Sequence, residues 1–266
     1  MEEKDVLLQE KKGNIGIITF NRPEQRNALS VELLGKFSMA LAKWSKDETI
    51  RAVIITGAGS KAFSSGFDLF NIPENLSPEI KKIIASNNPI KNALNSLKHF
   101  PYPTIAMMNG ATFGAALHIA FCCDIRIGVD DIAVGMPVGK LGLVYNTEGI
   151  IQFIKILGIA KARELFFTAR TYKGNEVKEM GIVNYLAPRE KLLSTTLCIA
   201  EQIAINAPLS LKGVKKIINM FEPSWSLNAS DLNKAEEIVA AARSSKDFKE
   251  GKKAFKEKRK PVFMGF

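Results

Sequence analysis

The sequence predicts an α/β fold, because short apolar runs alternate along the chain with longer segments of helical periodicity. Residues 52–56 (AVIIT) and 104–108 (TIAMM) are mainly apolar, which is typical of buried parallel strands. Residues 27–44 place apolar side chains at helical spacing, and Ser30 is suited to cap such a helix. The order strand, helix, strand favours right-handed βαβ units.

The other elements follow from the same two patterns in chain order. Residues 6–9 and 15–20 are predicted to pair as strands, because β-branched residues dominate the second run and residues 11–14 (KKGN) supply a turn. The elements expected after these are helix 89–99, helix 114–122, strands 125–128 and 132–134, and helices 149–157, 160–168, 174–180, 190–206, 209–219, 232–242 and 247–258. We therefore expect a core domain at residues 1–205 and a C-terminal helical region at residues 206–266.

The composition is typical of a folded globular protein, with 46% hydrophobic and 24% charged residues among 266. The formal net charge of +10 admits an anionic partner, such as a nucleic acid or a phosphorylated small molecule. Eight Lys or Arg residues lie between positions 246 and 260, which fits either a solvated helix face or a phosphate-binding surface. No aromatic stripe that could stack bases accompanies them, so a nucleic-acid partner is not expected.

The cysteines and the N-terminus indicate where the chain resides. The chain has three cysteines, Cys122, Cys123 and Cys198, and an odd number favours a protein of the reducing cytoplasm. Their spacing is not that of a metal site, so we expect no bound metal. The first residues are charged and contain no apolar signal region, and no stretch approaches 18 uninterrupted apolar residues. We expect a cytoplasmic protein without a membrane span.

Residues 61–68 (KAFSSGFD) form the first of three turns that are suited to chemistry. Small residues and a glycine after the 52–56 strand allow a backbone N–H group to point into a cleft, as an oxyanion site requires. An ordinary loop has the same composition, so both interpretations stay open for this turn taken alone.

Residues 109–116 (NGATFGAA) form the second turn, between the 104–108 strand and a helix. Free N–H groups at a helix N-terminus attract developing negative charge, so a carbonyl oxygen between this turn and the first would be polarised from two sides. A dinucleotide site is excluded, because no G-x-G-x-x-G is present with an acidic residue about twenty positions later.

Residues 142–149 (GLVYNTEG) form the third turn, which opens another helix. Tyr145, Asn146 and Glu148 gather polar groups between apolar flanks. The alternative is structural: Asn146 or Thr147 caps the helix, and Glu148 lies in the first turn because the helix dipole favours an acid there.

Five segments resemble the crotonase superfamily, which includes enoyl-CoA hydratases and isomerases. They are NRPEQRNAL (21–29), KAFSSGFDL (61–69), PTIAMMNGATFGAALHIAFCCDIRIG (103–128), EVKEMGIVNYL (176–186) and EGKKAFKEKRKPVF (250–263). The resemblance implies a crotonase (ClpP-like) spiral of ββα units, with C-terminal helices covering the active site and a trimer interface. It also implies a homotrimer or a dimer of trimers.

The resemblance assigns a role to matching residues. It places the two oxyanion N–H groups at Phe67 and Ala115, and it implies an acyl-CoA thioester substrate whose enolate these groups stabilise. No cofactor is expected beyond the CoA moiety of the substrate. The residues that the resemblance assigns to CoA contacts are Glu24, Gln25, Arg26, Lys61, Ala62, Phe63, Phe255 and Lys258.

The subfamily depends on residues that depart from the usual pattern. Typical hydratases carry two glutamates that activate water, and His118 and Val138 stand at those positions here, so two-glutamate hydration is disfavoured. LGLVYN (141–146) and ELFFTAR (164–170) are similar to segments of methylmalonyl-CoA decarboxylases. This resemblance implies that Tyr145 of this chain would assist the loss of CO2. Phe67 and His118 depart from that enzyme, which has a histidine and a glutamate there.

Three further alternatives stay open. Glu148, in a T-E-G segment, fits the proton-shuttling glutamate of Δ3,Δ2-enoyl-CoA isomerases. His118 is either a buried core residue or a participant, as a neutral hydrogen-bond donor or a proton shuttle. A non-catalytic scaffold that binds CoA or RNA is the alternative from another class, because both hydratase glutamates are absent and the chain is basic.

Overall fold

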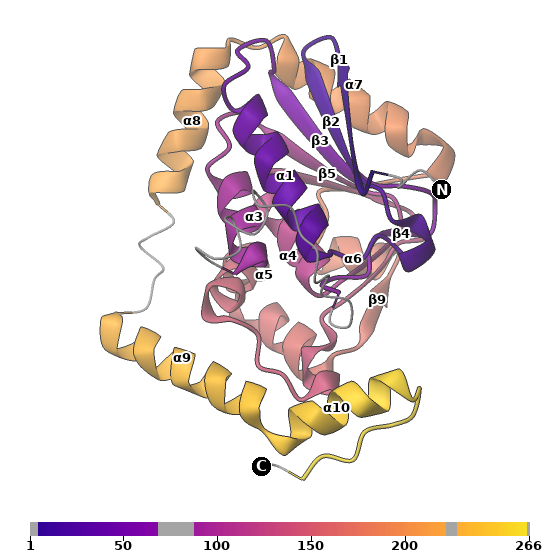
Figure 1. The fold of residues 1–266 in the computed structure, drawn as a ribbon. Helices are drawn as coiled ribbons and strands as arrows, with labels where there is room; N and C mark the ends of the chain where they lie inside the picture. Colours follow the sequence, from indigo (N-terminus) through magenta and orange to yellow (C-terminus); the bar gives the residue numbers. More distant parts are fainter. Residues whose placement is uncertain (1–4, 69–87, 222–227, 265–266) are drawn as a thin grey trace. The chain divides into compact units, whose positions relative to one another are not determined.

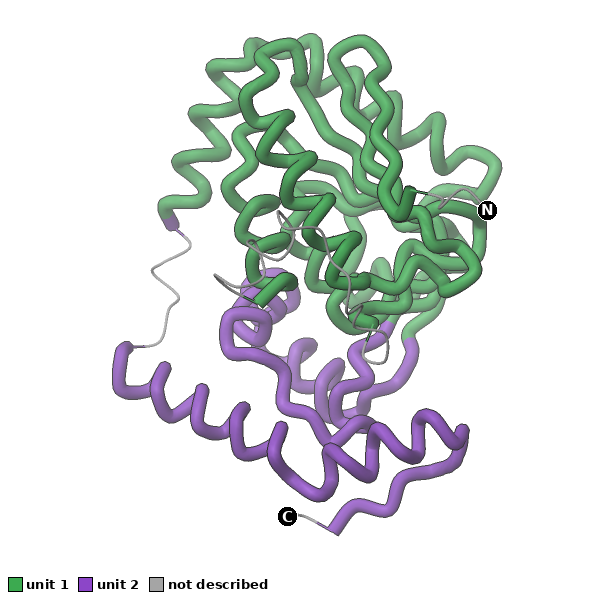
Figure 2. Tube along the Cα trace, in the orientation of Figure 1, with its two compact units in different colours: residues 1–134, 172–220 green, residues 135–171, 221–266 purple. Residues whose placement is uncertain are grey.

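The computed structural model of the chain describes residues 5–68, 88–221 and 228–264. The chain divides into two compact units, and each is described by itself (Figure 2). Unit 1 comprises residues 1–134 and 172–220, and unit 2 comprises residues 135–171 and 221–266. The predicted α/β class is confirmed. The predicted domain boundary at residue 205 stays a prediction.

A six-stranded sheet forms the centre of unit 1 (Figure 1). Its strands, in spatial order, are β1 (Leu7–Lys12), β2 (Ile15–Phe20), β3 (Ala52–Gly57), β5 (Thr104–Met108), β7 (Ile125–Val129) and β10 (Tyr185–Ala187). β1 and β2 form an antiparallel hairpin, as the sequence predicts, and every other pair is parallel. β3 and β5 are buried throughout, so the carboxyl ends of adjacent buried strands meet at one edge of the sheet.

A second sheet consists of three-residue strands in the order β4, β6, β8, β9. These are β4 (Ala62–Ser64), β6 (Ala111–Phe113), β8 (Ala133–Gly135) and β9 (Thr171–Lys173). β4 and β6 pair in parallel. Three residues are too few to show a periodicity, so the sequence indicated only β8 among them.

The helices of unit 1 surround these strands. They are η1 (Pro23–Gln25), α1 (Val31–Trp44), α3 (Pro89–Lys98), α4 (Ala115–Cys122), α6 (Asn175–Glu179), η3 (Arg189–Lys191), α7 (Leu192–Ala204) and α8 (Pro208–Met220). Ser30 caps α1 as predicted, because its side chain accepts a hydrogen bond from the amide of Leu33 at 3.2 Å. The helix begins four residues later than predicted, since Asn27 has a positive φ of 55° and is fully buried.

Unit 2 is mainly helical. Its elements are η2 (Pro137–Leu141), α5 (Thr147–Thr168), α9 (Ala229–Ser244) and α10 (Lys246–Lys256). The two predicted helices at 149–157 and 160–168 form α5, which is interrupted at Gly158 with a φ of 75°. α10 packs against the end of η2, where a Cβ atom on Gly142 would lie 2.7 Å from the carbonyl oxygen of Asp247.

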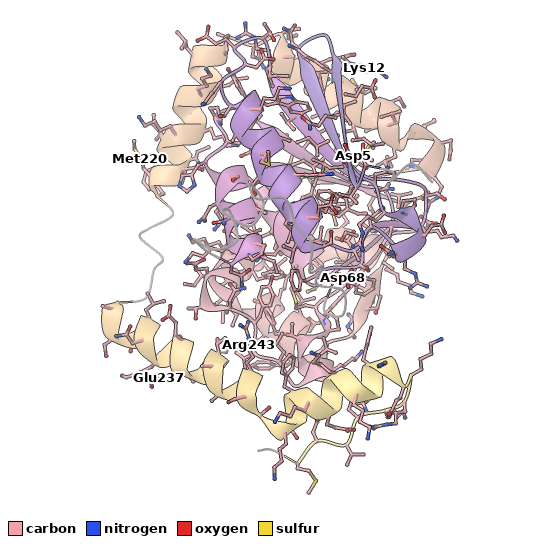
Figure 3. All side chains as sticks on the ribbon, viewed as in Figure 1. Asp5, Lys12, Asp68, Met220, Glu237 and Arg243 are labelled. Atoms are coloured by element: carbon pink, nitrogen blue, oxygen red, sulfur yellow. The ribbon has the colours of Figure 1, made fainter. Side chains whose placement is uncertain are left out.

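Helix α8 binds the rest of unit 1 through its polar side. Lys215 Nζ donates to the carbonyl oxygen of Tyr102 at 2.9 Å and to Asp124 Oδ2 at 2.7 Å. Its exposed apolar residues are Leu209, Val214, Ile217, Ile218 and Met220, the last labelled in Figure 3. Among the described residues, no single helix is long and apolar enough to cross a membrane. The bent pair Arg189–Ala204 and Pro208–Met220 together reaches the length and apolar composition of a membrane span.

Candidate active site

The first two predicted turns lie in direct contact within unit 1. The amide of Ala111 donates to the carbonyl oxygen of Lys61 at 3.1 Å, which extends the pairing of β4 with β6. A Cβ atom on Gly110 would lie 2.6 Å from the same carbonyl oxygen, so only glycine allows the two segments to come this close. Segments that are about fifty residues apart in the sequence thus form one structure.

Gly66 forms a second point of contact between these turns. Its φ of 97° is a conformation that residues with a side chain rarely adopt. A Cβ atom there would lie 2.7 Å from the carbonyl oxygen of Phe113 and 3.5 Å from the amide nitrogen of Ala115. The peptide that joins Gly66 to Phe67 therefore lies beside the first amide of α4.

Within the part of the chain that the structure describes, the amides of Phe67 and Ala115 have no hydrogen-bond acceptor. Leu29 fixes the chain around Phe67, since its amide donates to Gly66 at 2.8 Å and its carbonyl oxygen accepts from Asp68 at 3.1 Å. Ala115 is the first residue of α4, where amides have no intrahelical acceptor. Within residues 5–68, 88–221 and 228–264, neither amide donates a hydrogen bond. Two adjacent N–H groups, one of them at a helix N-terminus, are suited to bind a negatively charged oxygen.

Two buried asparagine side chains support the turns. Asn109 Nδ2 donates to the carbonyl oxygens of Gly57 at 2.8 Å and Gly59 at 2.7 Å. Asn27 Nδ2 donates to the carbonyl oxygens of Ala58 at 2.9 Å and Ala62 at 2.8 Å. Sequence reasoning assigned neither residue a role. The sequence did offer an indication of their importance, because each asparagine lies inside one of the five segments that resemble the crotonase superfamily and caps no helix.

The carboxylate of Asp68, the residue after Phe67, is engaged in an ion pair. Asp68, labelled in Figure 3, accepts from Arg22 Nη1 at 3.1 Å, and both side chains are largely buried. The same nitrogen donates to the carbonyl oxygen of Ala28 at 2.7 Å. The pair therefore joins the segment before α1 to the first turn, and removing one partner would leave a buried charge uncompensated.

His118 is buried in the middle of α4, with 1% of its surface exposed. Burial, with a smaller contribution from the charge of Lys98, lowers the pKa of its imidazole to about 3. The ring is therefore neutral at pH 7. Val138, at the second position where a hydratase glutamate is expected, is also buried.

The predicted CoA segments of unit 1 lie beside each other. Glu24, Gln25 and Arg26 are exposed, and the carbonyl oxygen of Arg26 accepts from the amide of Ser65 at 2.9 Å. Lys61 is also exposed. The side chains of Ala62 and Phe63 belong to the core, so only their main chain is available to a ligand.

Tyr145 and Glu148 lie in unit 2, at the start of α5. The Tyr145 ring is 8% exposed and packs edge-on against Phe153, with ring centroids 6.1 Å apart. Asn146 is the helix cap, since its Oδ1 accepts from the amide of Gly149 at 2.7 Å. Gly149 lies directly against the Tyr145 ring. Glu148 is exposed in the first helical turn.

Residues 10–265 match the enoyl-CoA hydratase/isomerase family. The chain belongs to this family. The match spans both compact units and includes all of the predicted site residues. It confirms the resemblance that the sequence segments indicated, and it establishes an enzyme family that acts on acyl-CoA.

Relatives of this family member carry different names. The short-chain-enoyl-CoA hydratase of Clostridium acetobutylicum is 33% identical, over 98% of this chain and 97% of that protein. The methylmalonyl-CoA decarboxylase of Escherichia coli is 29% identical, over 94% of this chain and 95% of that protein. The solved structure of methylmalonyl-CoA decarboxylase in complex with 2-nitronate-propionyl-CoA has a TM-score of 0.89 at 28% identity, covering 98% of this chain and 99% of that one. The fold is shared, whereas the reaction differs among relatives.

In the basic segment at residues 246–260, acidic side chains of the same segment partly neutralise the positive charge. Arg259 Nη1 and Nη2 donate to the two carboxylate oxygens of Glu250 at 2.5 and 2.9 Å, which lowers the pKa of Glu250 to about 2. Phe255 is 62% exposed on α10. Lys258 follows the helix with a positive φ of 54°. These two predicted CoA contacts lie in unit 2, whereas the other six lie in unit 1.

Proposed function

We propose that this enzyme decarboxylates an acyl-CoA of the methylmalonyl-CoA type by stabilising a thioester enolate between the amides of Phe67 and Ala115. The observation that carries the proposal is the pair of adjacent N–H groups that donate no hydrogen bond within the described residues. Such groups stabilise an oxygen on which negative charge develops, because they are already oriented before the reaction begins.

The residues at the two positions where hydratases carry glutamates favour a reaction that needs no ionised base. In decarboxylation, the bond between Cα and the carboxylate carbon breaks, CO2 leaves, and the electron pair forms an enolate whose charge lies on the thioester oxygen. The enolate then takes a proton from solvent at Cα. No side chain must remove a proton, which agrees with a neutral His118 and an apolar Val138 where hydratases carry glutamates.

Tyr145 is assigned to the departing carboxylate in this proposal. Its hydroxyl would hold that carboxylate out of the plane of the thioester, which aligns the breaking bond with the developing enolate. The ring is suited to a fixed position, because it is buried against Phe153 and Phe166. The similarity of residues 141–146 to methylmalonyl-CoA decarboxylases supports the same assignment.

A second candidate is Δ3,Δ2-enoyl-CoA isomerisation with Glu148 as the proton shuttle. The observation that favours it is the exposed carboxylate of Glu148 in the first turn of α5. A carboxylate that faces the α and γ carbons of a 3-enoyl-CoA could move one proton between them. The same pair of amides would stabilise the dienolate.

The proposal extends to binding and assembly. The exposed residues Glu24, Gln25, Arg26 and Lys61, the main chain of residues 62–63, and Phe255 and Lys258 would contact CoA. The assembly would be a homotrimer or a dimer of trimers in the cytoplasm, and the uncovered apolar residues of α8 agree with an oligomer.

One assay separates the candidate reactions. The protein is incubated with methylmalonyl-CoA, with a 3-enoyl-CoA and with a 2-enoyl-CoA, and products are identified by mass spectrometry. We expect propionyl-CoA from the first substrate. Turnover of only an enoyl-CoA would refute the decarboxylase proposal. Saturable RNA binding, with turnover of none of the three substrates, would favour the scaffold hypothesis.

Two variants assign the side chains. Tyr145→Phe should lower decarboxylation about tenfold, which corresponds to about 1.4 kcal/mol, whereas Glu148→Gln should change it less than twofold. The exposed Tyr185→Phe is the matched control. If Glu148→Gln abolishes turnover of a 3-enoyl-CoA and Tyr145→Phe does not, the isomerase assignment replaces the decarboxylase assignment.

A further inference from the structure

Arg189 lies where the loops that follow four parallel strands meet. It comes two residues after β10 and begins η3. Its Nη1 donates to the carbonyl oxygen of Ser60, in the loop after β3, at 2.8 Å, and to that of Asn109, directly after β5, at 3.0 Å. Its Nη2 binds the carboxylate of Asp131, in the turn after β7. One guanidinium group therefore joins all four loops at the carboxyl edge of the sheet.

Two of these loops carry the proposed oxyanion amides. Ser60 directly precedes the turn that contains Phe67, and Asn109 begins the turn that contains Ala115. Arg189 binds both turns at their starting points, while Gly66 brings their far ends together next to Ala115. The paired turns are therefore in contact at both ends.

We propose that Arg189 is a positioning residue that holds the two oxyanion turns in register, so that the amides of Phe67 and Ala115 point to one oxygen. The inference rests on the proposed function of those amides. The planar guanidinium group is suited to this role, because a single rigid group offers donors in fixed directions to two carbonyl oxygens and one carboxylate. Asp131 accepts a hydrogen bond from Arg189 and thereby helps to orient the guanidinium group.

The alternative is an ordinary surface ion pair. The side chains of Arg189 and Asp131 are 41% and 64% exposed, and such pairs contribute little to stability. Under this alternative, removing either partner has the same small effect. Under our proposal, Arg189→Ala removes the contacts to both turns, whereas Asp131→Asn leaves the two carbonyl contacts in place.

The first test separates turnover from binding. Steady-state kinetics are measured with whichever acyl-CoA the wild-type protein converts. We expect Arg189→Ala to lower kcat about tenfold with less than a threefold change in KM, because misplaced donors weaken transition-state binding more than substrate binding. Arg189→Lys should recover part of the loss, and Asp131→Asn should lower kcat less than threefold. Arg170→Ala, which removes an ion pair of similar exposure with Glu164, should leave kcat unchanged.

The second test does not depend on activity. Amide hydrogen exchange is followed by mass spectrometry in peptides that cover residues 58–68 and 109–116. We expect Arg189→Ala to raise exchange in both peptides together, with the melting temperature within about 3 °C of the wild type, and Arg170→Ala to raise it in neither. Unchanged exchange in both peptides, or an equal rise throughout unit 1, would overturn the positioning role. If the wild type converts no acyl-CoA, the proposed function fails, and the exchange experiment still decides whether Arg189 holds the turns.

Discussion

The paired turns of unit 1 and the start of α5 in unit 2 use different parts of the chain for their proposed chemistry. In unit 1 the proposed groups are two backbone amides, in turns that glycines and buried asparagine side chains support. In unit 2 the proposed groups are the side chains of Tyr145 and Glu148. A backbone amide remains when its side chain changes, whereas a hydroxyl or a carboxylate does not. If the proposed backbone site is present, a change of side chains could alter the reaction and leave that site in place, and relatives of similar sequence do carry different reaction names.

The largest expected effect concerns His118, inside the helix that supports the backbone site. Its folded pKa of about 3 lies below the unfolded value of about 6.5, so the unfolded chain binds more protons between these values. Stability is therefore full above pH 6.5 and falls as the pH decreases toward 3, by up to about 5 kcal/mol.

Urea unfolding at pH 7.5 and pH 4.5 measures this effect. The wild type should lose about 3 kcal/mol more than His118→Gln between these two values, since about two pH units below the unfolded pKa are involved. The exposed His99→Gln is the matched control and should behave as the wild type does. Equal pH dependence of the wild type and His118→Gln would show that burial does not hold the imidazole neutral.

Gly66→Ala should produce the next largest effect. The new Cβ atom would lie 2.7 Å from the carbonyl oxygen of Phe113, so the two turns must separate. We expect turnover to fall about a hundredfold, which corresponds to about 2.7 kcal/mol. Gly158→Ala is the control, because Gly158 has a φ of 75° and no atom within 4 Å of a Cβ. If both variants lose activity equally, the loss arises from the strain of placing alanine at a positive φ, and the close approach of the two turns is not its cause.

Gly149→Ala tests the side-chain site in unit 2 through packing. A methyl group there would overlap the Tyr145 ring and displace it from its contacts with Phe153 and Phe166. Decarboxylation should fall about tenfold, as for Tyr145→Phe, or about 1.4 kcal/mol. Gly139→Ala is the control, since its Cβ would lie at an ordinary 3.7 Å from Phe166. The decarboxylation rates of the two purified variants test this expectation. Full activity of Gly149→Ala would show that Tyr145 does not belong to the proposed site.

Phe67→Leu should have the smallest effect. Its side chain is partly exposed, and only its amide belongs to the proposed oxyanion site. We expect kcat to change less than threefold, which is less than about 0.7 kcal/mol. A larger loss, measured beside Gly66→Ala, would mean that the Phe67 ring takes part and that the distinction between the two regions does not hold.

Long elements were predicted from local pattern alone. Strands 15–20 and 104–108 have the predicted bounds, and Ser30 caps α1 as expected, because β-branched composition and capping chemistry are encoded within a few neighbouring residues. The start of α1 was wrong, since Asn27 is fixed by hydrogen bonds to carbonyl oxygens more than thirty residues away. Strands β4 and β6 were missed, since they are three residues long and are defined by pairing with segments distant in the sequence.

The sequence by itself determined the α/β class, the family, and the absence of glutamates at positions 118 and 138, because these depend on residue identity and order. Only the tertiary structure decided that Gly66 lies beside Ala115, since no local pattern specifies which distant segments pair. It also decided that the imidazole of His118 is neutral, because its pKa depends on how far the surrounding elements exclude water. The contact of Arg189 with both turns is of the same kind, since four strands must be in place before their loops can meet.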